Sequence, residues 1–514
     1  MSKKILLLLT TLLFASRLLF VNTQNIFFDS AEYTNLFSNS NYLLAIISGH
    51  PPPHEGYIIL FWPIFQLAKF LNLNPVYSVI VGQILLSFLS VYCFYNIVKF
   101  LTDKKVALFS SIIVSLIPIF WITNVTVMME TTYLSFFLVS MYFLIQYIKN
   151  SKKLVYLHLS TLSLSLSFLT HTLVILWLPL YIAIVYYYKR NVLLKTIRFA
   201  IIYLIFALIL NLLFISFIFS ESINYAFKYL YLTKGGEFAY LNLDINSFLI
   251  AIRNFLIPLM RNNTYLIFIL GILSLIMSFK TNKKIFTLGI LWLFPAFYAN
   301  QWWDSLLNGR HALIASFGLA FLAAYLIKKR TIFVCIVIIY LLIASVPTLN
   351  LLKKPIPYIQ EAQFAKTLPS GSLLIETHFA RPQVQDVKLL NFFFVNEPGF
   401  DKNNLSERIN KYLENNKQVF ISSGALSEPY GLYSGPYLHN ITLSYTKHFE
   451  LEPVIKNYTL KKYKIINAED NLIIYEIVSK NPSNYPEVKN LRNSYRRLDY
   501  NDPLWRLSSR FIPQ

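Results

Sequence analysis

The stretch FAIIYLIFALILNLLFISFIF, residues 199–219, decides the class of fold because no charged side chain interrupts it. A helix of about 20 apolar residues crosses the hydrocarbon core of a bilayer, which is roughly 30 Å thick. Ten more apolar runs of similar length occur, at 5–21, 76–98, 106–122, 131–148, 154–170, 172–188, 264–279, 285–299, 311–327 and 332–350. The sequence therefore predicts an α-helical polytopic membrane protein with about 11 transmembrane helices.

The composition agrees with this class. The 514 residues are 55% hydrophobic and only 14% charged, and the mean hydropathy is +0.49. These values are too apolar for a soluble globular chain. The two cysteines, Cys93 and Cys335, lie within apolar runs, which favours buried thiols over a disulfide framework.

Basic residues flank the apolar runs and predict the orientation of the chain. With 11 spans, every basic cluster before residue 351 falls on one side, which the positive-inside rule identifies as cytoplasmic. That side carries 18 basic residues and a single acid, Asp103. The clusters are Lys3/Lys4, Lys99/Lys104/Lys105, Lys149/Lys152/Lys153, Lys189/Arg190/Lys195/Arg198, Lys280/Lys283/Lys284 and Lys328/Lys329/Arg330. Topology thus explains much of the net charge of +21, and we predict no nucleic-acid partner.

The run GYIILFWPIFQLAKFL at 56–71 is an exception, since it is short and contains a proline, a glutamine and a lysine. If it spanned the membrane, the later basic clusters would lie opposite the N-terminal lysines. We therefore predict an interfacial helix on the outer leaflet, within a first outer loop at about 22–75. The run 5–21 could instead be a cleaved signal peptide, and Asp29 is extracytoplasmic in either case.

The character of the chain changes after about residue 350. The predicted organisation is a transmembrane domain at 1–350, a small extracytoplasmic α/β domain at 351–480 and an irregular polar tail at 481–514. No nucleophile elbow, glycine-rich phosphate loop or zinc-ligand spacing occurs after residue 350, so we assign no chemistry to that part.

Ionisable residues of the first 350 positions collect on the predicted outer side. They are Asp29, Glu32, His50, His54, Glu55, Glu130, His171, Asp304, Arg310 and His311. A charge at the centre of a bilayer costs about 2.5–3.5 kcal/mol on insertion scales, so solvation alone explains part of this pattern. The remainder indicates a functional site at the outer face.

The segment DSAEY at 29–33 leads this set. If it opens a helix, Asp29 and Glu32 share one face near the positive N-terminal end. The alternative is a helix start in which Asp29 is the N-cap and Glu32 its capping-box partner.

A second segment, GHPPPHEGY at 49–57, places His50, His54 and Glu55 around three prolines, which form a stiff loop suited to holding side chains at an interface. These two histidines and the acid could bind a metal, although their spacing is not a specific metal signature.

Together these segments resemble a known family. The set resembles the GT-C superfamily of integral-membrane glycosyltransferases. Its members are DSAEY after the first span, GHPPPHEGY before an interfacial helix, METTYLSF at 129–136, SLSFLTHTLVILWLPLY at 165–181 and GRHAL at 309–313. The most similar pattern is that of the protein O-mannosyltransferase-like group, and it covers residues 1 to about 330. The chain departs from that pattern by inserting Pro-His-Glu where a glycine usually follows the two prolines.

The resemblance implies transfer of a sugar from a polyprenyl-phosphate-linked donor to an extracytoplasmic protein, lipid or glycan, by an inverting single displacement. Asp29 would be the catalytic base, with Glu32 as a further acid. Glu130 would orient the acceptor or, with Asp29, hold a divalent cation such as Mg²⁺ or Mn²⁺; no cofactor is certain. Phosphate is a good leaving group, so the reaction needs a base and positive charge rather than a strong general acid.

The remaining candidates would bind substrate. Arg310 would donate two parallel hydrogen bonds to the lipid phosphate. Alternatively, Arg310 is an interface residue whose side chain snorkels to water. His171 and His311 would donate hydrogen bonds to phosphate or to sugar hydroxyls. Alternatively, they are interface residues at helix ends whose hydrogen bonds are made within the protein. Trp302 and Trp303, beside Asp304, would stack on the sugar or belong to an aromatic belt.

Two other functions stay open on the sequence. A transporter or lipid flippase also has many spans, but it places ionisable groups near the midplane of repeated halves. A polymer ligase that uses a lipid-diphosphate donor would share the outer-face arginines. The expected partners are the lipid donor, membrane lipid and an unidentified acceptor, and the expected location is a prokaryotic plasma membrane.

Overall fold

The computed structural model describes residues 11–12, 15–24, 28–47, 54–219, 252, 255–256, 259–260, 262–299, 313–351, 357–377, 387, 390–395, 402–426, 451–467 and 472–480. Contacts within the chain divide it into two compact units. The first, the helical unit, consists mainly of Glu32–Lys353 together with Met1–Thr23. The second, the sheet unit, consists mainly of Lys354–Pro436 and Asn440–Gln514 together with Gln24–Ala31.

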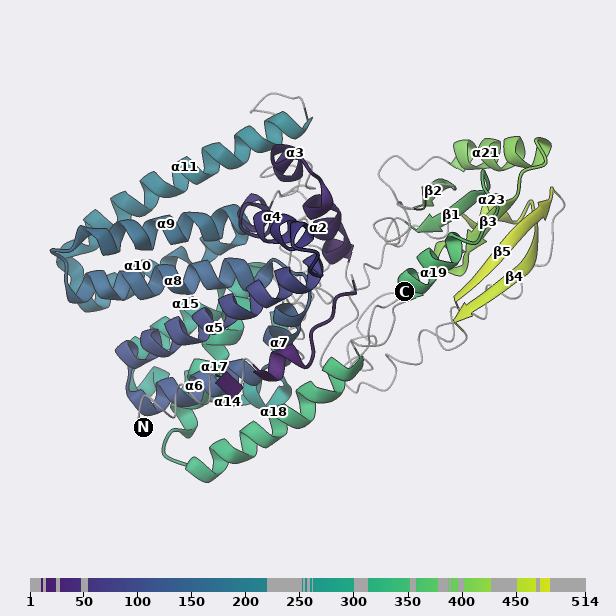
Figure 1. Ribbon diagram of the computed structural model, residues 1–514. Coiled ribbons are helices and arrows are strands. Elements are labelled where there is room, and N and C mark those ends of the chain that lie inside the picture. Colours follow the sequence, from purple (N-terminus) through teal and green to yellow (C-terminus); the bar gives the residue numbers. More distant parts are fainter. Residues whose placement is uncertain are drawn as a thin grey trace. The chain divides into compact units, whose positions relative to one another are not determined.

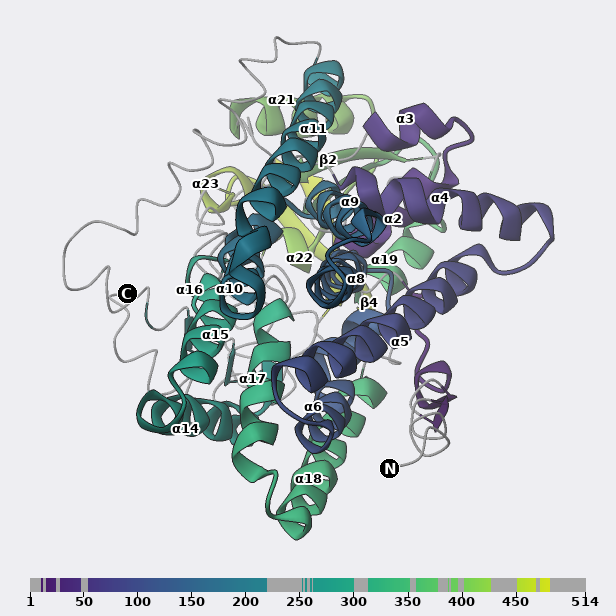
Figure 2. The ribbon, with the colours of Figure 1, turned by 90° about the vertical axis from the view of Figure 1, so that its left-hand side faces the viewer.

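The helices of the helical unit lie side by side (Figure 1). They are α2 (Phe28–Ser38, which starts in the other unit), α3 (Tyr42–Ile47), α4 (Glu55–Phe70), α5 (Pro75–Leu101), α6 (Lys104–Leu116), α7 (Pro118–Val125), α8 (Glu130–Lys149), α9 (Leu154–Thr170), η1 (Thr172–Trp177), α10 (Leu178–Lys189), η2 (Arg190–Val192), α11 (Leu193–Phe219), α14 (Tyr265–Thr281), α15 (Lys283–Leu293), α16 (Pro295–Ala299), α17 (Leu313–Ile327) and α18 (Thr331–Leu351). Helix α8 packs against both α5 and α9, and α9 in turn contacts α11 (Figure 2).

Seven of the eleven predicted spans each coincide with one helix, within a few residues at most ends: 76–98, 131–148, 154–170, 199–219, 264–279, 311–327 and 332–350. The runs 106–122, 172–188 and 285–299 are each divided into two helices, and part of 5–21 lies outside the described residues. In the described part of the chain, three helical stretches are long and apolar enough to cross a membrane: α5, α8 and the continuous stretch Thr172–Phe214. The pair α6 and α7, bent by 60°, would make a fourth, and four shorter apolar helices accompany them. The structure thus shows a mostly helical protein with several apolar helices, while the number of 11 spans stays a prediction.

The bend between α6 and α7 corrects the prediction of one continuous span at 106–122. Pro118 has no N–H to donate and cannot continue the helix, so carbonyl groups of the preceding turn lose their usual donors. The Nη2 atom of Arg17 donates to the Ser115 carbonyl at 2.6 Å, and the hydroxyl of Ser345 donates to the Leu116 carbonyl at 2.7 Å. Arg17 is only 2% exposed, and its guanidinium lies 5.2 Å from the ring centre of Trp121.

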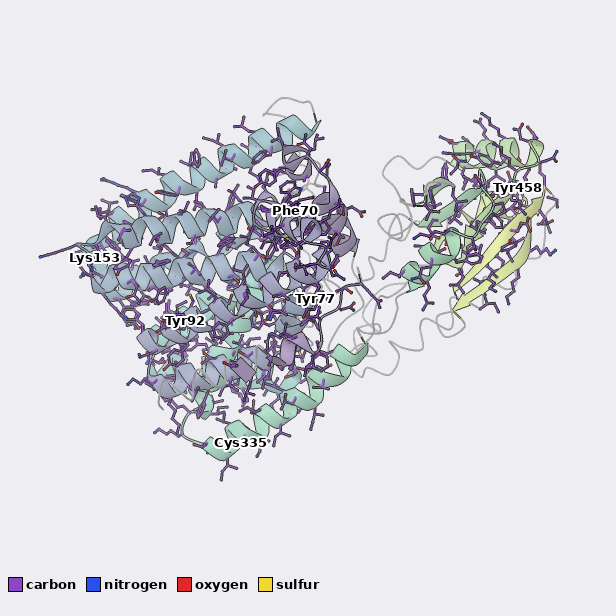
Figure 3. All side chains as sticks on the ribbon, in the orientation of Figure 1. Phe70, Tyr77, Tyr92, Lys153, Cys335 and Tyr458 are labelled. Carbon is purple, nitrogen blue, oxygen red and sulfur yellow. The ribbon has the colours of Figure 1, made fainter. Side chains whose placement is uncertain are left out.

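A helix forms where the interfacial run was predicted, and it is tied to the segment before it. The Trp62 indole donates to the Asn39 carbonyl at 2.8 Å, and the Gln66 amide donates to the Phe37 carbonyl at 2.6 Å. Phe70, at the end of α4, is 82% exposed. It lies with Tyr77 at the end of the helical unit opposite Lys153 (Figure 3). Helix α8 begins at Glu130 and ends at Lys149, four residues before Lys153. The acid and the lysines therefore lie at opposite ends of this helix.

The sheet unit contains a five-stranded mixed sheet in the order β2-β1-β3-β5-β4. Strands β1 (Leu373–Thr377), β2 (Asn391–Val395) and β3 (Val419–Ser422) are parallel, and β4 (Thr459–Asn467) and β5 (Leu472–Ser479) are antiparallel to their neighbours. Its helices are α19 (Pro357–Ala365), α21 (Lys402–Glu414), α22 (Ser423–Leu426) and α23 (Glu452–Ile455). One apolar cluster joins Leu405 of α21 to Ile421, and another joins Ala365 of α19 to Phe420, so helices cover both faces. The tail 481–514 lies outside the described residues.

Candidate active site

The segment DSAEY lies in α2, as predicted. The helix begins at Phe28, so Asp29 is its second residue and not its N-cap. Glu32 is partly buried, and Tyr33, one turn after Asp29, is 1% exposed. The side chain of Asp29 lies outside the described part of the structure.

Tyr33 belongs to a cluster of aromatic rings contributed by α2, the start of α4, α8 and the end of α9. Its ring centre lies 4.8 Å from that of Tyr57 and 5.9 Å from that of His54. His54 and His171 are 5.7 Å apart, and His171 is 5.1 Å from Tyr133. All five are buried, so the cluster presents phenol and imidazole groups, each of which can donate a hydrogen bond.

His54 is also anchored by a polar contact. Its Nδ1 atom lies 3.0 Å from the carbonyl oxygen of Thr170, at the end of α9. Because a carbonyl accepts, Nδ1 carries the proton in this contact. His54 therefore joins the segment before α4 to the end of α9.

Glu130 is the first residue of α8 and is fully buried. The positive end of the helix dipole favours a carboxylate at this position. Burial, and secondly the nearby Glu130 carboxylate, raise the pKa of the Tyr57 phenol well above its ordinary value. Glu130 thus lies within electrostatic reach of the aromatic cluster.

Glu55 is a second fully buried acid at this end of the unit. Asn211 of α11 donates from Nδ2 to the Glu55 carboxyl, whose two oxygens are each 3.3 Å away. Burial raises the pKa of Glu55 from 4.5 to about 8, although the Asn211 contact opposes the shift.

This pKa predicts a pH dependence of stability. The folded protein holds the proton more tightly than the unfolded chain, so the contribution of Glu55 is fully present below pH 4.5 and is lost as the pH rises to about 8. We expect the unfolding temperature of wild type, relative to Glu55→Gln, to fall by a few degrees between pH 5 and pH 8. Parallel unfolding curves for the two proteins across this range would show that Glu55 does not titrate in this way.

Gly56 allows α4 to approach α9 closely. A Cβ atom at this position would collide with the Thr170 hydroxyl and would lie 3.0 Å from the Leu166 carbonyl and the Thr170 amide. Backbone atoms cannot move aside as a flexible side chain can, so the two helices would have to separate.

We expect Gly56→Ala to destabilise the protein by about 1–3 kcal/mol, the usual cost of overpacking, and to lower activity by displacing His54 and Glu55. The matched control is Gly271→Ala, because the new methyl group there would meet the end of the Leu319 side chain, which can move. Thermal unfolding and activity of both variants test this, and equal behaviour of the two would rule out the close approach as the cause.

Two comparisons bear on this geometry. Residues 51–218, which include His54, Tyr57, Glu130, Tyr133 and His171, match the family model of dolichyl-phosphate-mannose-protein mannosyltransferases. The fold matches the crystal structure of ArnT from Cupriavidus metallidurans bound to undecaprenyl phosphate, with a TM-score of 0.54 and 8% identity over 94% of this chain and 100% of that one. Residues 51–218 are thus similar to this mannosyltransferase family, and the chain has the fold of ArnT.

The chain is also similar to the Archaeoglobus fulgidus oligosaccharyltransferase in complex with Zn and sulfate. The TM-score is 0.47 and the identity 10%, over 90% of this chain and 69% of that one. No curated protein sequence matches.

The described part of the structure brings together three of the predicted site residues, His54, Glu130 and His171, through the aromatic cluster. Glu55 adjoins His54 but faces Asn211, and Glu32 adjoins Tyr33 in α2. Six other predicted residues lie outside the described residues: His50, Trp302, Trp303, Asp304, Arg310 and His311. In the part that is described, no group of three or more His, Cys, Asp or Glu is arranged to hold a metal.

The sequence interpretation missed the tyrosines of the candidate site. Each one follows a candidate acid closely: Tyr33 ends DSAEY, Tyr57 ends GHPPPHEGY and Tyr133 lies in METTYLSF. This repeated order of acid and then tyrosine was a usable signal. The abundance of tyrosine, 35 residues in all, concealed it.

Proposed function

We propose that this chain transfers a sugar from a polyprenyl-phosphate-linked donor to an acceptor at the extracytoplasmic end of its helical unit. The observation that carries the proposal is the buried Glu130 at the start of α8, beside a cluster of phenol and imidazole groups. The undecaprenyl phosphate bound to ArnT, a protein of the same fold, supports a lipid phosphate as the leaving group.

The proposed reaction is a single displacement at the anomeric carbon, with inversion. The acceptor oxygen forms a bond to that carbon while the bond to the phosphate oxygen breaks, and polyprenyl phosphate leaves. Asp29 takes the acceptor proton, and Glu130 orients the acceptor. Arg310 offers two parallel N–H groups to the departing phosphate, and His171 and His311 donate further hydrogen bonds.

Glu32, His50, His54, Glu55 and Asp304 complete the proposed binding site, with Trp302 and Trp303 stacked on the sugar. A divalent cation held by Asp29 and Glu130 would suit carboxylate and phosphate oxygens, which are the usual ligands of Mg²⁺. It would supply positive charge to the phosphate.

The direct test uses purified protein in liposomes with polyprenyl-phosphate mannose that carries a radiolabel on the sugar. Membranes of the producing cells, stripped of their own donor, serve as acceptor. The expected result is label transferred to protein, glycan or lipid and free polyprenyl phosphate in equal amounts. Failure to release polyprenyl phosphate from a series of donors with different sugars would overturn the proposal.

The proposal includes 11 spans, with α4 on the outer leaflet and residues 351–480 outside. In a variant without Cys93 and Cys335, a cysteine at Asn74 is expected to react with an impermeant thiol reagent from outside, because the helix preceding it does not span. Lys153→Cys is the control and is expected to react only from inside. Labelling of Asn74→Cys only from inside would show that α4 spans the membrane as a twelfth helix.

A further inference from the structure

Gln83 is a polar residue in the third turn of α5, within the mainly apolar run 76–98. Its side chain is fully buried. A buried amide in an apolar helix is costly unless its hydrogen bonds are made. The position of Gln83 therefore calls for a reason beyond packing.

The amide of Gln83 makes three hydrogen bonds to other elements. Its Oε1 accepts from the Tyr57 hydroxyl at 3.1 Å. Its Nε2 donates to the Met128 carbonyl at 2.6 Å and to the Thr123 carbonyl at 3.3 Å. These partners require one orientation of the amide, in which Oε1 faces the hydroxyl that donates and Nε2 faces the two carbonyl groups that accept.

The two carbonyl groups belong to the segment that leads from α7 into α8. Met128 lies two residues before Glu130. Thr131, the residue after Glu130, has its hydroxyl 2.9 Å from the Thr123 carbonyl and 2.8 Å from Oδ1 of Asn124. Hydrogen bonds therefore fix the backbone on both sides of Glu130, and the Thr123 carbonyl is shared between them.

Tyr57 connects the same amide to the aromatic cluster. Its ring contacts that of Tyr33, and its hydroxyl ends on Gln83. The Gln83 side chain thus contacts both Tyr57, whose ring adjoins Tyr33 of the cluster, and the carbonyl of Met128, two residues before Glu130.

We propose that Gln83 is a positioning residue, which fixes the start of α8 and so the direction of the Glu130 carboxylate. This inference rests on the role of Glu130 in the proposed function. A displacement of about 1 Å in an active site can cost about 100-fold in rate. Gln83→Met, which keeps the length of the side chain but makes no hydrogen bond, is therefore expected to lower kcat by about 10- to 100-fold and to leave KM for the lipid donor within about twofold.

The first test does not depend on activity. Hydrogen exchange of the backbone amides at 126–131 is expected to accelerate about tenfold or more in Gln83→Met. The matched control is Tyr181→Phe, which loses a buried hydrogen bond to Ser160 in another part of the unit. Unchanged exchange at 126–131, or equal acceleration in the control, would overturn the proposal.

The second test is a double-mutant cycle with Glu130→Gln, using radiolabelled polyprenyl-phosphate mannose. If Gln83 acts through Glu130, Gln83→Met lowers transfer by wild type but not further by Glu130→Gln. A loss of the same factor in both backgrounds would indicate general structural damage and would overturn the proposal. Full activity of Glu130→Gln would instead overturn the proposed function of Glu130, whatever the exchange rates, which keeps the two failures distinct.

Discussion

Glu130→Gln is expected to reduce sugar transfer by about 100-fold or more, as for removal of a group that contacts the reacting atoms. The amide has the shape of the carboxyl but carries no charge, so it can neither attract a proton nor hold a cation. Glu130 is fully buried, and loss of a buried charge removes a cost of solvation. The unfolding temperature is therefore expected to stay the same or to rise.

Initial rates and thermal unfolding of the same preparation test this combination. Glu407→Gln, an exposed acid-to-amide change in α21, is the control. A fall in both rate and unfolding temperature for Glu130→Gln would point to a structural carboxylate, and an unchanged rate would exclude Glu130 from the site.

Asp29→Asn is expected to abolish detectable transfer while the protein keeps its fold and abundance. Proton removal by a positioned base contributes about 10²- to 10⁴-fold to a rate, and no neighbouring group replaces it if Asp29 is the base. Asparagine preserves the volume and the helix, so stability is expected to be unchanged.

The matched control for Asp29→Asn is Asp103→Asn. Asp103 is the N-cap of α6, and it lies 3.5 Å from the Lys328 ammonium. Asparagine serves nearly as well as aspartate at an N-cap, so this variant is expected to fold and to retain its rate. Normal product formation by Asp29→Asn would remove the base from the mechanism and leave Glu32 and Glu130 as the acids to examine.

Much of the helical architecture was predictable because the apolar runs have the length and punctuation of spans. The run 131–148, for example, corresponds to α8 at Glu130–Lys149. The prediction failed at some of the prolines inside a run, although Pro347 does not divide α18. Pro118 divides 106–122 into α6 and α7, and Pro295 divides 285–299 into α15 and α16. Hydrophobicity alone does not register a missing backbone donor.

For the candidate site, the sequence analysis singled out His54, Glu130 and His171, which the structure brings near one aromatic cluster. The partners of those residues were not predictable. Gln83 binds Met128 and Thr123, 45 and 40 residues away, and Asn211 binds Glu55 across 156 residues. A single sequence contains no sign of such pairs. Each polar residue, taken alone, looks like an isolated interruption of an apolar run that costs a little free energy.

The bend between α6 and α7 also bears on the order in which the chain is assembled in the membrane. Two backbone carbonyl groups at the bend accept hydrogen bonds from distant side chains. Arg17 donates to one from 98 residues earlier, and Ser345 donates to the other from 229 residues later. Arg17 is already synthesised when the bend enters the bilayer, whereas Ser345 arrives with α18. Until then one peptide oxygen faces hydrocarbon or a transient partner, a state that costs several kcal/mol. We therefore expect the contact from Ser345 to complete the helical unit, and a chain truncated before α18 to be less stable in the membrane.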